Sequence, residues 1–256
     1  MNIKILVALH KPYWLPKDSC YFPLQVGAAG KDSFGIRRDD EGENISEKNP
    51  NFCELTALYW GFKHIDADYI GLCHYRRYFT KRERFRLQKR KEAVLSAEDW
   101  EKLLSKYPVI VPKKRHHFIE TNKNHYYHAH HREGLDALEA VLEEKYPEYV
   151  KSYEKVMERT WAHLFNMFVM RKDYFDRYMT FLFDVLFEVE KRVDITGYSV
   201  YEARIFGFLA ERLLDVWLDA EDISYKEQNV TFLERQNWIK KGTNFLLRKF
   251  RGRGEN

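Results

Sequence analysis

Basic side chains directly follow several apolar runs that the sequence offers as β-strands. His10 and Lys11 follow residues 3–9, and the tetrapeptide His74-Tyr-Arg-Arg77 follows residues 69–73. Six more basic residues come after residues 108–112 and 165–170: Lys113, Lys114, Arg115, His116, His117 and Arg171. In open α/β sheets ligands bind outside the carboxyl ends of the strands, and an Arg fork matches phosphate oxygens. The pattern predicts a positive cleft for a diphosphate, with ordinary polar loops as the simpler alternative.

Strand-like and helix-like segments alternate along the 256 residues. Apolar runs at 3–9, 69–73, 108–112 and 165–170 predict strands. Apolar residues at helical spacing predict helices at 52–64, 135–144, 174–193 and 199–218, and a capping box at Ser96 predicts another up to residue 107. We therefore expect one α/β domain over residues 1–235, with a mostly parallel central sheet and a helical C-terminal part.

Two common nucleotide-binding motifs are missing. The sequence contains neither GxxxxGK[ST] nor GxGxxG, which argues against a P-loop hydrolase and a dinucleotide dehydrogenase. Asp66 and Asp68 have the spacing and chemistry of a pair that holds Mg²⁺ or Mn²⁺, but they precede the strand 69–73 instead of following it. We therefore expect no metal cofactor, with fixed cations neutralising the diphosphate and a divalent metal as the less favoured alternative.

Composition excludes further classes of protein. With 45% hydrophobic and 32% charged residues the chain is neither disordered nor collagen-like. Three cysteines without CxxC spacing predict reduced thiols, and the histidines between 125 and 131 fit a polar helix face more simply than a zinc site. The apolar run 5–9 is too short for a signal peptide or a membrane span, so we predict a cytoplasmic protein.

Positive charge is concentrated in two segments. Residues 76–91 hold nine basic residues and one acid, and residues 236–256 form a basic amphipathic tail around Phe245, Leu246, Leu247 and Phe250. Such segments attract anionic surfaces. We predict that the tail holds the protein peripherally at the inner face of the cytoplasmic membrane, although a solvated charged loop explains either segment equally well.

Several blocks of sequence form a recognisable pattern. They are residues 43–60 (ENISEKNPNFCELTALYW), residues 69–79 (YIGLCHYRRYF), residues 128–136 (HAHHREGLD), residues 165–170 (FNMFVM) and residues 204–214 (RIFGFLAERLL). Together they resemble a bacterial family of capsular and exopolysaccharide biosynthesis glycosyltransferases, over nearly the whole chain up to about residue 220.

The resemblance implies a GT-A-like fold and a nucleotide-sugar-dependent enzyme. It suggests transfer of a hexosyl unit, with galactofuranose or galactose as possible sugars, from a UDP-sugar to a lipid-linked or oligosaccharide acceptor in capsular polysaccharide, exopolysaccharide or lipopolysaccharide synthesis. Nucleic acid is not an expected partner in that function. The rival hypothesis is a non-catalytic module that binds RNA or a polyanionic glycan, supported by the basic segment and the 16% aromatic content.

Donor-binding candidates come from both the strand ends and the neighbouring loops. His74, Arg76 and Arg77 are the predicted diphosphate ligands, and regular strand alternation predicts that His74 and Arg76 share a face while Arg77 points away. Asn44, Lys48, Asn49 and Glu54 either bind a ribose, uracil or sugar hydroxyl or serve local helix capping. The full donor-binding prediction is His10, Lys11, Asn44, Lys48, Asn49, Glu54, His74, Arg76, Arg77, Asn166 and Arg204.

Candidates for acid–base catalysis lie nearer the C-terminus. His131 and Asp136 either orient the acceptor or assist proton transfer, and Asp136, Glu202 and Glu211 are the alternative general bases. Arg204 and Glu211 are seven residues apart on one predicted helical stripe, so they form either a buried ion pair or part of the site. Asn166, within an apolar strand, either binds donor sugar or satisfies backbone groups.

Overall fold

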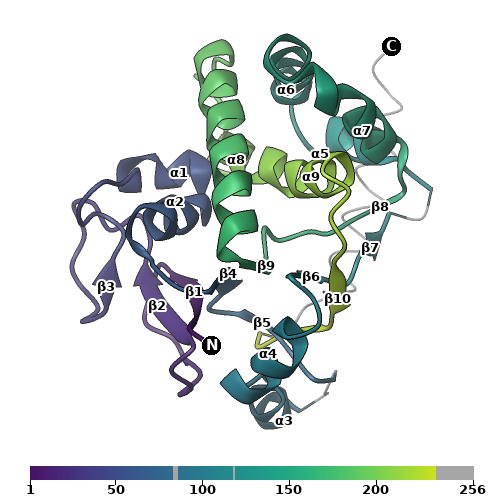
Figure 1. The fold of residues 1–256 in the computed structure, drawn as a ribbon. Coiled ribbons are helices and arrows are strands. Elements are labelled where there is room, and N and C mark those ends of the chain that lie inside the picture. The colour runs from purple at the N-terminus through teal and green to yellow at the C-terminus, as the bar shows by residue number, and fades with distance from the viewer. Residues whose placement is uncertain (83–85, 118, 235–256) are drawn as a thin grey trace.

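A nine-stranded sheet lies at the centre of the molecule (Figure 1) in this computed structural model, which describes residues 1–82, 86–117 and 119–234. The main path of strands is β10-β6-β9-β4-β1-β2-β3, and β5 and β11 pair beside β4. The strands are β1 (Ile3–Leu9), β2 (Tyr21–Gln25), β3 (Arg37–Arg38), β4 (Tyr69–His74), β5 (Arg77–Phe79), β6 (Val109–Pro112), β9 (Phe168–Arg171), β10 (Lys226–Gln228) and β11 (Val230–Phe232). A separate ribbon pairs β7 (Arg115–His116) with β8 (Trp161–Ala162).

Strand direction decides which loops meet at one edge. β1 runs parallel to β2 and β4, and β6 runs parallel to β10. β9 is antiparallel to both β4 and β6, so β4 and β6 point the same way. The predicted mostly parallel sheet is therefore confirmed. The reversed β9 places Arg171 beside Tyr69, at the edge opposite the carboxyl ends, so its expected position in the cationic cleft is wrong.

Helices cover both faces of the sheet (Figure 1). They are η1 (Ser46–Lys48), α1 (Asn49–Phe52), α2 (Leu55–His64), α3 (Leu87–Glu92), α4 (Ala97–Leu104), α5 (Asn122–Ala129), α6 (Arg132–Lys145), α7 (Pro147–Glu158), α8 (Lys172–Arg192), η2 (Glu202–Arg204) and α9 (Ile205–Ala220). The predicted helices are confirmed as α2, α4, α6, α8 and α9, and the helix α4 has the capping box at Ser96. The helix α5 carries His125 and His128, two of the histidines assigned to a polar helix face, and α7 was not predicted.

The strands pack against two separate apolar cores because successive side chains of a strand point to opposite faces. Leu6 and Ala8 of β1 lie in the larger core with α2, α6, α8 and α9, whereas Ile5 and Val7 lie in the smaller one with Trp100 of α4. A strand buried on both faces shows a continuous apolar run. This burial explains why β1 and β4 were readable from the sequence.

Left-handed backbone interrupts two of the predicted elements. Asn166 does not lie in a strand, because β9 begins only at Phe168, and Phe165 and Asn166 have φ of +82° and +52°. The predicted helix 52–64 is divided between α1 and α2 at Cys53, whose φ is +54°. Non-glycine residues seldom adopt positive φ, so side-chain periodicity did not reveal these breaks.

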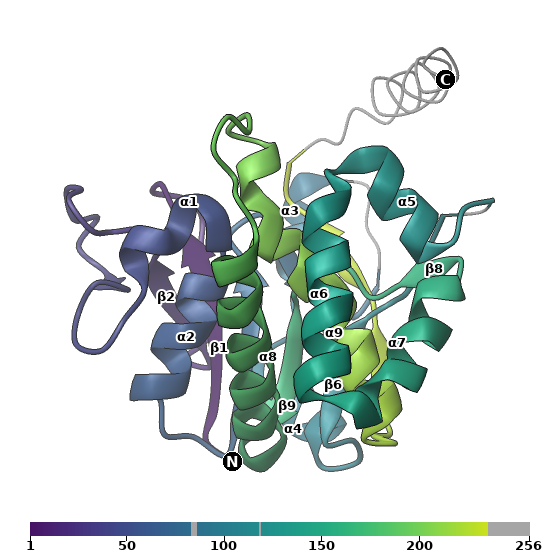
Figure 2. The ribbon, with the colours of Figure 1, turned by 90° about the horizontal axis from the view of Figure 1, so that it is seen from above.

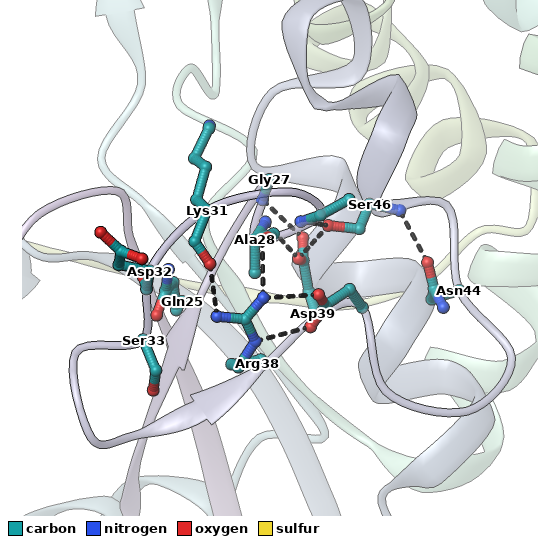
Figure 3. A network of polar contacts seen from close by, with 12 residues as sticks. Gln25, Gly27, Ala28, Lys31, Asp32, Ser33, Arg38, Asp39, Asn44 and Ser46 are labelled. Atoms are coloured by element: carbon teal, nitrogen blue, oxygen red, sulfur yellow. Dashed lines mark hydrogen bonds and ion pairs between the residues drawn. The ribbon is translucent and has the colours of Figure 1, made fainter.

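A buried carboxylate organises the long loop between β2 and α1 (Figure 3). Asp39 is fully buried and accepts hydrogen bonds from the Gly27 and Ala28 amides, at 2.8 and 3.0 Å, and from the Ser46 hydroxyl. The Arg38 guanidinium donates to the carbonyl oxygens of Lys31 and Ala28, both at 2.8 Å. These bonds fix the backbone that carries Lys31, whose side chain extends away from the network (Figure 3).

The C-terminal tail 236–256, predicted to contact membrane, lies outside the described residues. Within the described residues, none of the helices combines the length and apolar character needed to cross a membrane.

We expect Asp39→Ala to destabilise the fold by about 3 kcal/mol, because buried amide hydrogens lose a charged acceptor. The free energy of unfolding in urea measures the effect. Asp32→Ala, in the same loop but with an exposed side chain, is the control and should change stability by less than about 0.5 kcal/mol. Equal losses in the two variants would contradict the role given to Asp39.

Candidate functional site

A cationic cluster lies at the carboxyl ends of β1 and β4. We give this name to His10, Lys11, Lys31, Arg76 and Arg204. Burial lowers the pKa of His10, and the charges of Lys11, Lys31, Arg76 and Arg204 lower it further, so each of the four cations lies near the His10 imidazole. The His10 imidazole is also 3.2 Å from the Tyr75 hydroxyl. Four of the five are predicted donor-binding residues, and Lys31 is new.

The members of the cationic cluster differ in how they are held. Arg76 is ion-paired with Glu234 at 2.8 Å and stacks over Tyr75. Lys11 and Lys31 have no ion pair within the described part of the chain, although Lys11 lies over the Tyr75 ring. Unpaired cations repel one another, so an anion placed between them would be stabilised. A diphosphate satisfies that requirement.

A second group, which we call the carboxylate cluster, lies beside the first. It contains Glu54, His74, Arg77, Asn166 and Glu211. Asn166 Nδ2 donates to Glu54 Oε1 at 2.8 Å and to the Gly207 carbonyl at 3.0 Å. Glu211 accepts the Phe165 amide at 2.8 Å and contacts Arg212 at 3.1 Å. The Glu54 and Glu211 side chains are only 12% and 19% exposed, so their charges are poorly solvated.

A tight turn divides the tetrapeptide 74–77 between the two clusters. His74 ends β4, Arg77 begins β5, and the two residues are paired across the turn. His74 and Arg77 therefore face the carboxylate cluster, whereas Arg76 belongs to the cationic cluster. The predicted alternation, with His74 and Arg76 together and Arg77 pointing away, is wrong because the strand ends at His74 instead of continuing.

Burial sets the ionisation of the carboxylate cluster. It raises the pKa of Glu211, which Glu54 raises further and Arg212 partly offsets. Burial lowers the pKa of His74, whose Nε2 is 2.7 Å from the Phe165 carbonyl. His74 is therefore a neutral imidazole at pH 7 that donates from Nε2.

Glu54 differs from Glu211 because one of its carboxylate oxygens has no hydrogen-bond partner among the described residues. Both Glu211 oxygens are engaged, one by the Phe165 amide and one by Arg212. Glu54 Oε1 accepts from Asn166 and lies 3.9 Å from His74 Nε2, and Oε2 has no hydrogen-bond partner among the described residues. Glu54 can therefore accept a proton without first breaking a contact at Oε2.

Arg77 supplies a guanidinium that has no acceptor among the described residues. It lies over the Phe165 and Phe232 rings, at 4.6 and 5.8 Å from their centroids, and makes no hydrogen bond or ion pair within the described residues. Burial lowers its pKa, while Glu54 and Glu211 favour the charged form. Arg115 also lies over Phe165, at 5.5 Å. A desolvated guanidinium such as that of Arg77 favours an anionic ligand.

Three predicted donor ligands have other protein partners in the structure. Asn44 forms a turn by accepting the Ser46 amide at 3.0 Å, and Lys48 pairs with Glu190 at 2.5 Å. Asn49 donates to the Cys53 carbonyl at 2.7 Å. Among the described residues, no side-chain hydrogen bond or ion pair joins any of the three to a side chain of either cluster. Local hydrogen bonds thus account for Asn44 and Asn49, whereas Lys48 joins η1 to α8, and the donor contacts of all three remain predictions.

The remaining catalytic candidates, His131, Asp136 and Glu202, have partners outside both clusters. His131 pairs with Glu202 at 3.2 Å, and Asp136 accepts from the Tyr127 hydroxyl at 2.7 Å. The predicted Arg204–Glu211 ion pair is absent from the described structure. Arg204 precedes α9 and donates to Cys53 Sγ at 3.1 Å, whereas Glu211 contacts Arg212. Arg204 and Glu211 do not share a helical stripe because Arg204 is the last residue of η2 and α9 begins after it.

Lys31 and Cys53 were missed as neighbours of the site. Lys31 lies in the polar loop 30–50, more than 40 positions from His74, and only tertiary folding places its charge near His10. Arg115 was part of the predicted cationic strand ends, and its position after β6 was the signal for it. The positive φ of Cys53, which turns the chain into Glu54, has no sequence signal.

A groove of about 640 Å³ lies at the opposite edge of the sheet. Its lining includes Asp66, Asp68, Arg171 and Lys172. Asp68 accepts the Asn2 amide at 2.7 Å and therefore has a structural role. The aspartate pair thus lies away from both clusters, as its place before β4 predicted. In residues 1–82, 86–117 and 119–234 no three His, Cys, Asp or Glu residues are arranged to hold a metal ion.

Comparison with known proteins agrees with this architecture. A solved apo structure of WbbM, a bifunctional glycosyltransferase, matches with a TM-score of 0.84 and 31% identity, covering 92% of this chain and 46% of that chain. This chain thus spans about half the length of WbbM. Comparison with curated proteins gave no significant match.

The fold class is therefore an α/β, GT-A-like fold with the two clusters at its carboxyl edge. Residues 4–222 match the family described as Domain of unknown function (DUF4422). The chain belongs to that family.

Proposed function

We propose that this chain is a glycosyltransferase that moves a hexosyl unit from a UDP-sugar to a polysaccharide acceptor. The observation that carries the proposal is the cationic cluster beside the carboxylate cluster at one sheet edge. A diphosphate needs the first, and deprotonation of an acceptor hydroxyl needs the second. The similarity to a bifunctional glycosyltransferase over 92% of the chain supports the same reaction class.

The cationic cluster holds the diphosphate in this proposal. Lys11 and Lys31 supply charges that no protein carboxylate neutralises in the described structure, and Arg76 and Arg204 supply planar forks. As the sugar leaves, negative charge accumulates on the β-phosphate. Cations already fixed around that position stabilise the charge without reorganising. The reaction therefore proceeds without a metal ion.

Glu54 is the proposed general base, instead of Asp136, Glu202 or His131. The acceptor oxygen attacks the anomeric carbon, its proton passes to Glu54 Oε2, and the bond from the anomeric carbon to the UDP oxygen breaks with its electron pair leaving on UDP. A single displacement of this kind inverts the anomeric configuration. Glu211 positions Phe165 and, with Glu54, compensates the charge of Arg77.

The proposal also includes the transferred sugar and the cellular location of the enzyme. The family resemblance favours galactofuranose or galactose as the transferred sugar and capsular, exopolysaccharide or lipopolysaccharide chains as acceptors. The basic tail 236–256 favours work at the inner face of the cytoplasmic membrane, where lipid-linked acceptors are accessible.

We expect UDP and UDP-sugars to raise the melting temperature of the wild-type protein, since ligands that bind only the folded state stabilise it. Arg76→Ala and Lys31→Ala should each weaken UDP binding at least tenfold, or about 1.4 kcal/mol, and should leave uridine binding unchanged. Lys102→Ala, an exposed lysine paired with Glu98 on α4, is the control. Unchanged UDP affinity in both variants, or RNA binding with a steep salt dependence in its place, would favour the polyanion-binding alternative.

We expect transfer and donor hydrolysis to persist after dialysis against EDTA, because in this proposal the cationic cluster neutralises the diphosphate instead of a metal ion. Turnover before and after chelation, with Mn²⁺ and Mg²⁺ restored in parallel, measures this. Strict dependence on added Mn²⁺ would disprove metal-independent catalysis.

We expect Glu54→Gln to lower kcat by roughly 10²–10⁴, the usual contribution of a general base, with little change in the KM for donor. Glu98→Gln, on an exposed position of α4, is the matched control. An equal loss in Asp136→Asn with full activity in Glu54→Gln would place the base on α6.

The pH profile gives a separate readout of the Glu211 carboxylate, whose charge compensates that of Arg77. Because burial raises the pKa of Glu211, half of the Glu211 carboxyl groups are protonated at a pH above the ordinary pKa of 4.5. The acid limb of kcat/KM should therefore lie above pH 4.5 and should move in Glu211→Gln.

A further inference from the structure

We propose that an aromatic ledge beside the carboxylate cluster binds a sugar ring of the acceptor glycan. The ledge consists of Tyr198, Tyr201 and Phe208 with the imidazoles of His130 and His131. The proposal rests on the proposed function, because it supplies the acceptor site for the same transfer.

Stacked rings build the ledge from two elements. The His131 ring stacks on Tyr198 with centroids 4.0 Å apart and planes at 17°. The His130 ring stacks on Phe208 at 4.0 Å and 25°, and Tyr201 lies 5.3 Å from Phe208. The histidines join α5 to α6, while the other three rings come from the α8–α9 connection and the start of α9. Ring-on-ring packing fixes the orientation of the exposed faces.

The outer part of the ledge is unusually exposed for apolar side chains. Tyr201 is 48% exposed and the preceding Val200 is 90% exposed. Two adjacent large apolar side chains left in water are more typical of a binding surface than of a solvated loop. In Figure 2 the green loop that joins α8 to α9 lies at the edge of the sheet where β1 ends.

The ledge continues directly into the carboxylate cluster. Gly207, next to Phe208, accepts Asn166 Nδ2, and Asn166 also donates to Glu54. The Arg204 guanidinium lies 5.7 Å from the Phe208 centroid and donates to Cys53, the neighbour of Glu54. Asn51 fixes this end of the loop by donating to the Ala203 carbonyl at 2.8 Å. A ring bound on the ledge thus lies next to the proposed base.

The polar rim of the ledge suits a neutral sugar. Sugar rings have apolar C–H faces that pack on aromatic rings, and hydroxyl groups at their edges that need polar partners. The rim supplies Glu202, paired with His131 and accepting from the Ser199 hydroxyl at 2.5 Å, and exposed Arg204. The charges of Glu133, Glu202 and Asp194 all add to the burial that raises the pKa of Tyr198. These three acids make the surroundings of Tyr198 negative, which disfavours an anionic ligand at that ring.

Saturation-transfer NMR of the full chain tests the ledge with defined probes, namely the methyl β-glycosides of galactopyranose, galactofuranose, glucopyranose and mannopyranose. We expect at least one glycoside to receive saturation at its ring C–H protons. Tyr201→Ala should reduce that signal at least fivefold, and Tyr201→Phe should retain it because the ring remains. Tyr107→Ala, at the opposite edge of the sheet, is the aromatic control.

The outcomes separate the ledge from the reaction. No saturation of any of the four glycosides by the wild type, or an equal signal in Tyr201→Ala, would overturn the ledge. UDP protection against thermal unfolding should be unchanged in Tyr201→Ala, since the tyrosine lies outside the cationic cluster. A wild type that binds a glycoside on the ledge but shows no UDP protection and no turnover would support the ledge while disproving the transferase.

Discussion

The site depends on the backbone of Phe165 being held from both sides. Glu211 accepts its amide, His74 lies against its carbonyl, and the left-handed conformation of Phe165 and Asn166 follows from these contacts together with the bond from Asn166 to Glu54. Residues in positive φ cost free energy and persist only where surrounding contacts fix them. Loss of this turn would separate Glu54, Glu211 and Arg77, which come from three distant segments of the chain.

Desolvation gives the two clusters opposite characters. In the carboxylate cluster the buried acids Glu54 and Glu211 lie near Arg77 and favour its charged form, and burial shifts the pKa values of Glu211 and His74. In the cationic cluster Lys11 and Lys31 lack acidic partners in the described structure, so a ligand must provide the compensation. Placing both clusters side by side brings a departing anion and an accepting carboxylate to one edge of the sheet.

The fold was largely predictable because the signals behind it are local. β1 and β4 are buried on both faces and therefore appear as continuous apolar runs, and α8 and α9 show helical spacing over many residues. The short strands β3, β10 and β11 carry two or three residues each, too few for a periodic signal. The reversal of β9 depends on pairing with β4 and β6, which periodicity does not encode. Because the reversal was not predicted, we expected Arg171 at the wrong edge of the sheet.

The sequence by itself determined the α/β class, the order of the main elements and the basic character of the strand ends, because burial and charge are properties of short segments. It also placed Asp66 and Asp68 before β4 and thus away from the carboxyl edge. Only the tertiary structure decided how these residues meet. The turn at Tyr75 and Arg76 divided one motif between two clusters, and Glu54 was separated from Asn44, Lys48 and Asn49, its neighbours in sequence. Side-chain partners across long sequence separations arise from packing, and no local pattern specifies them.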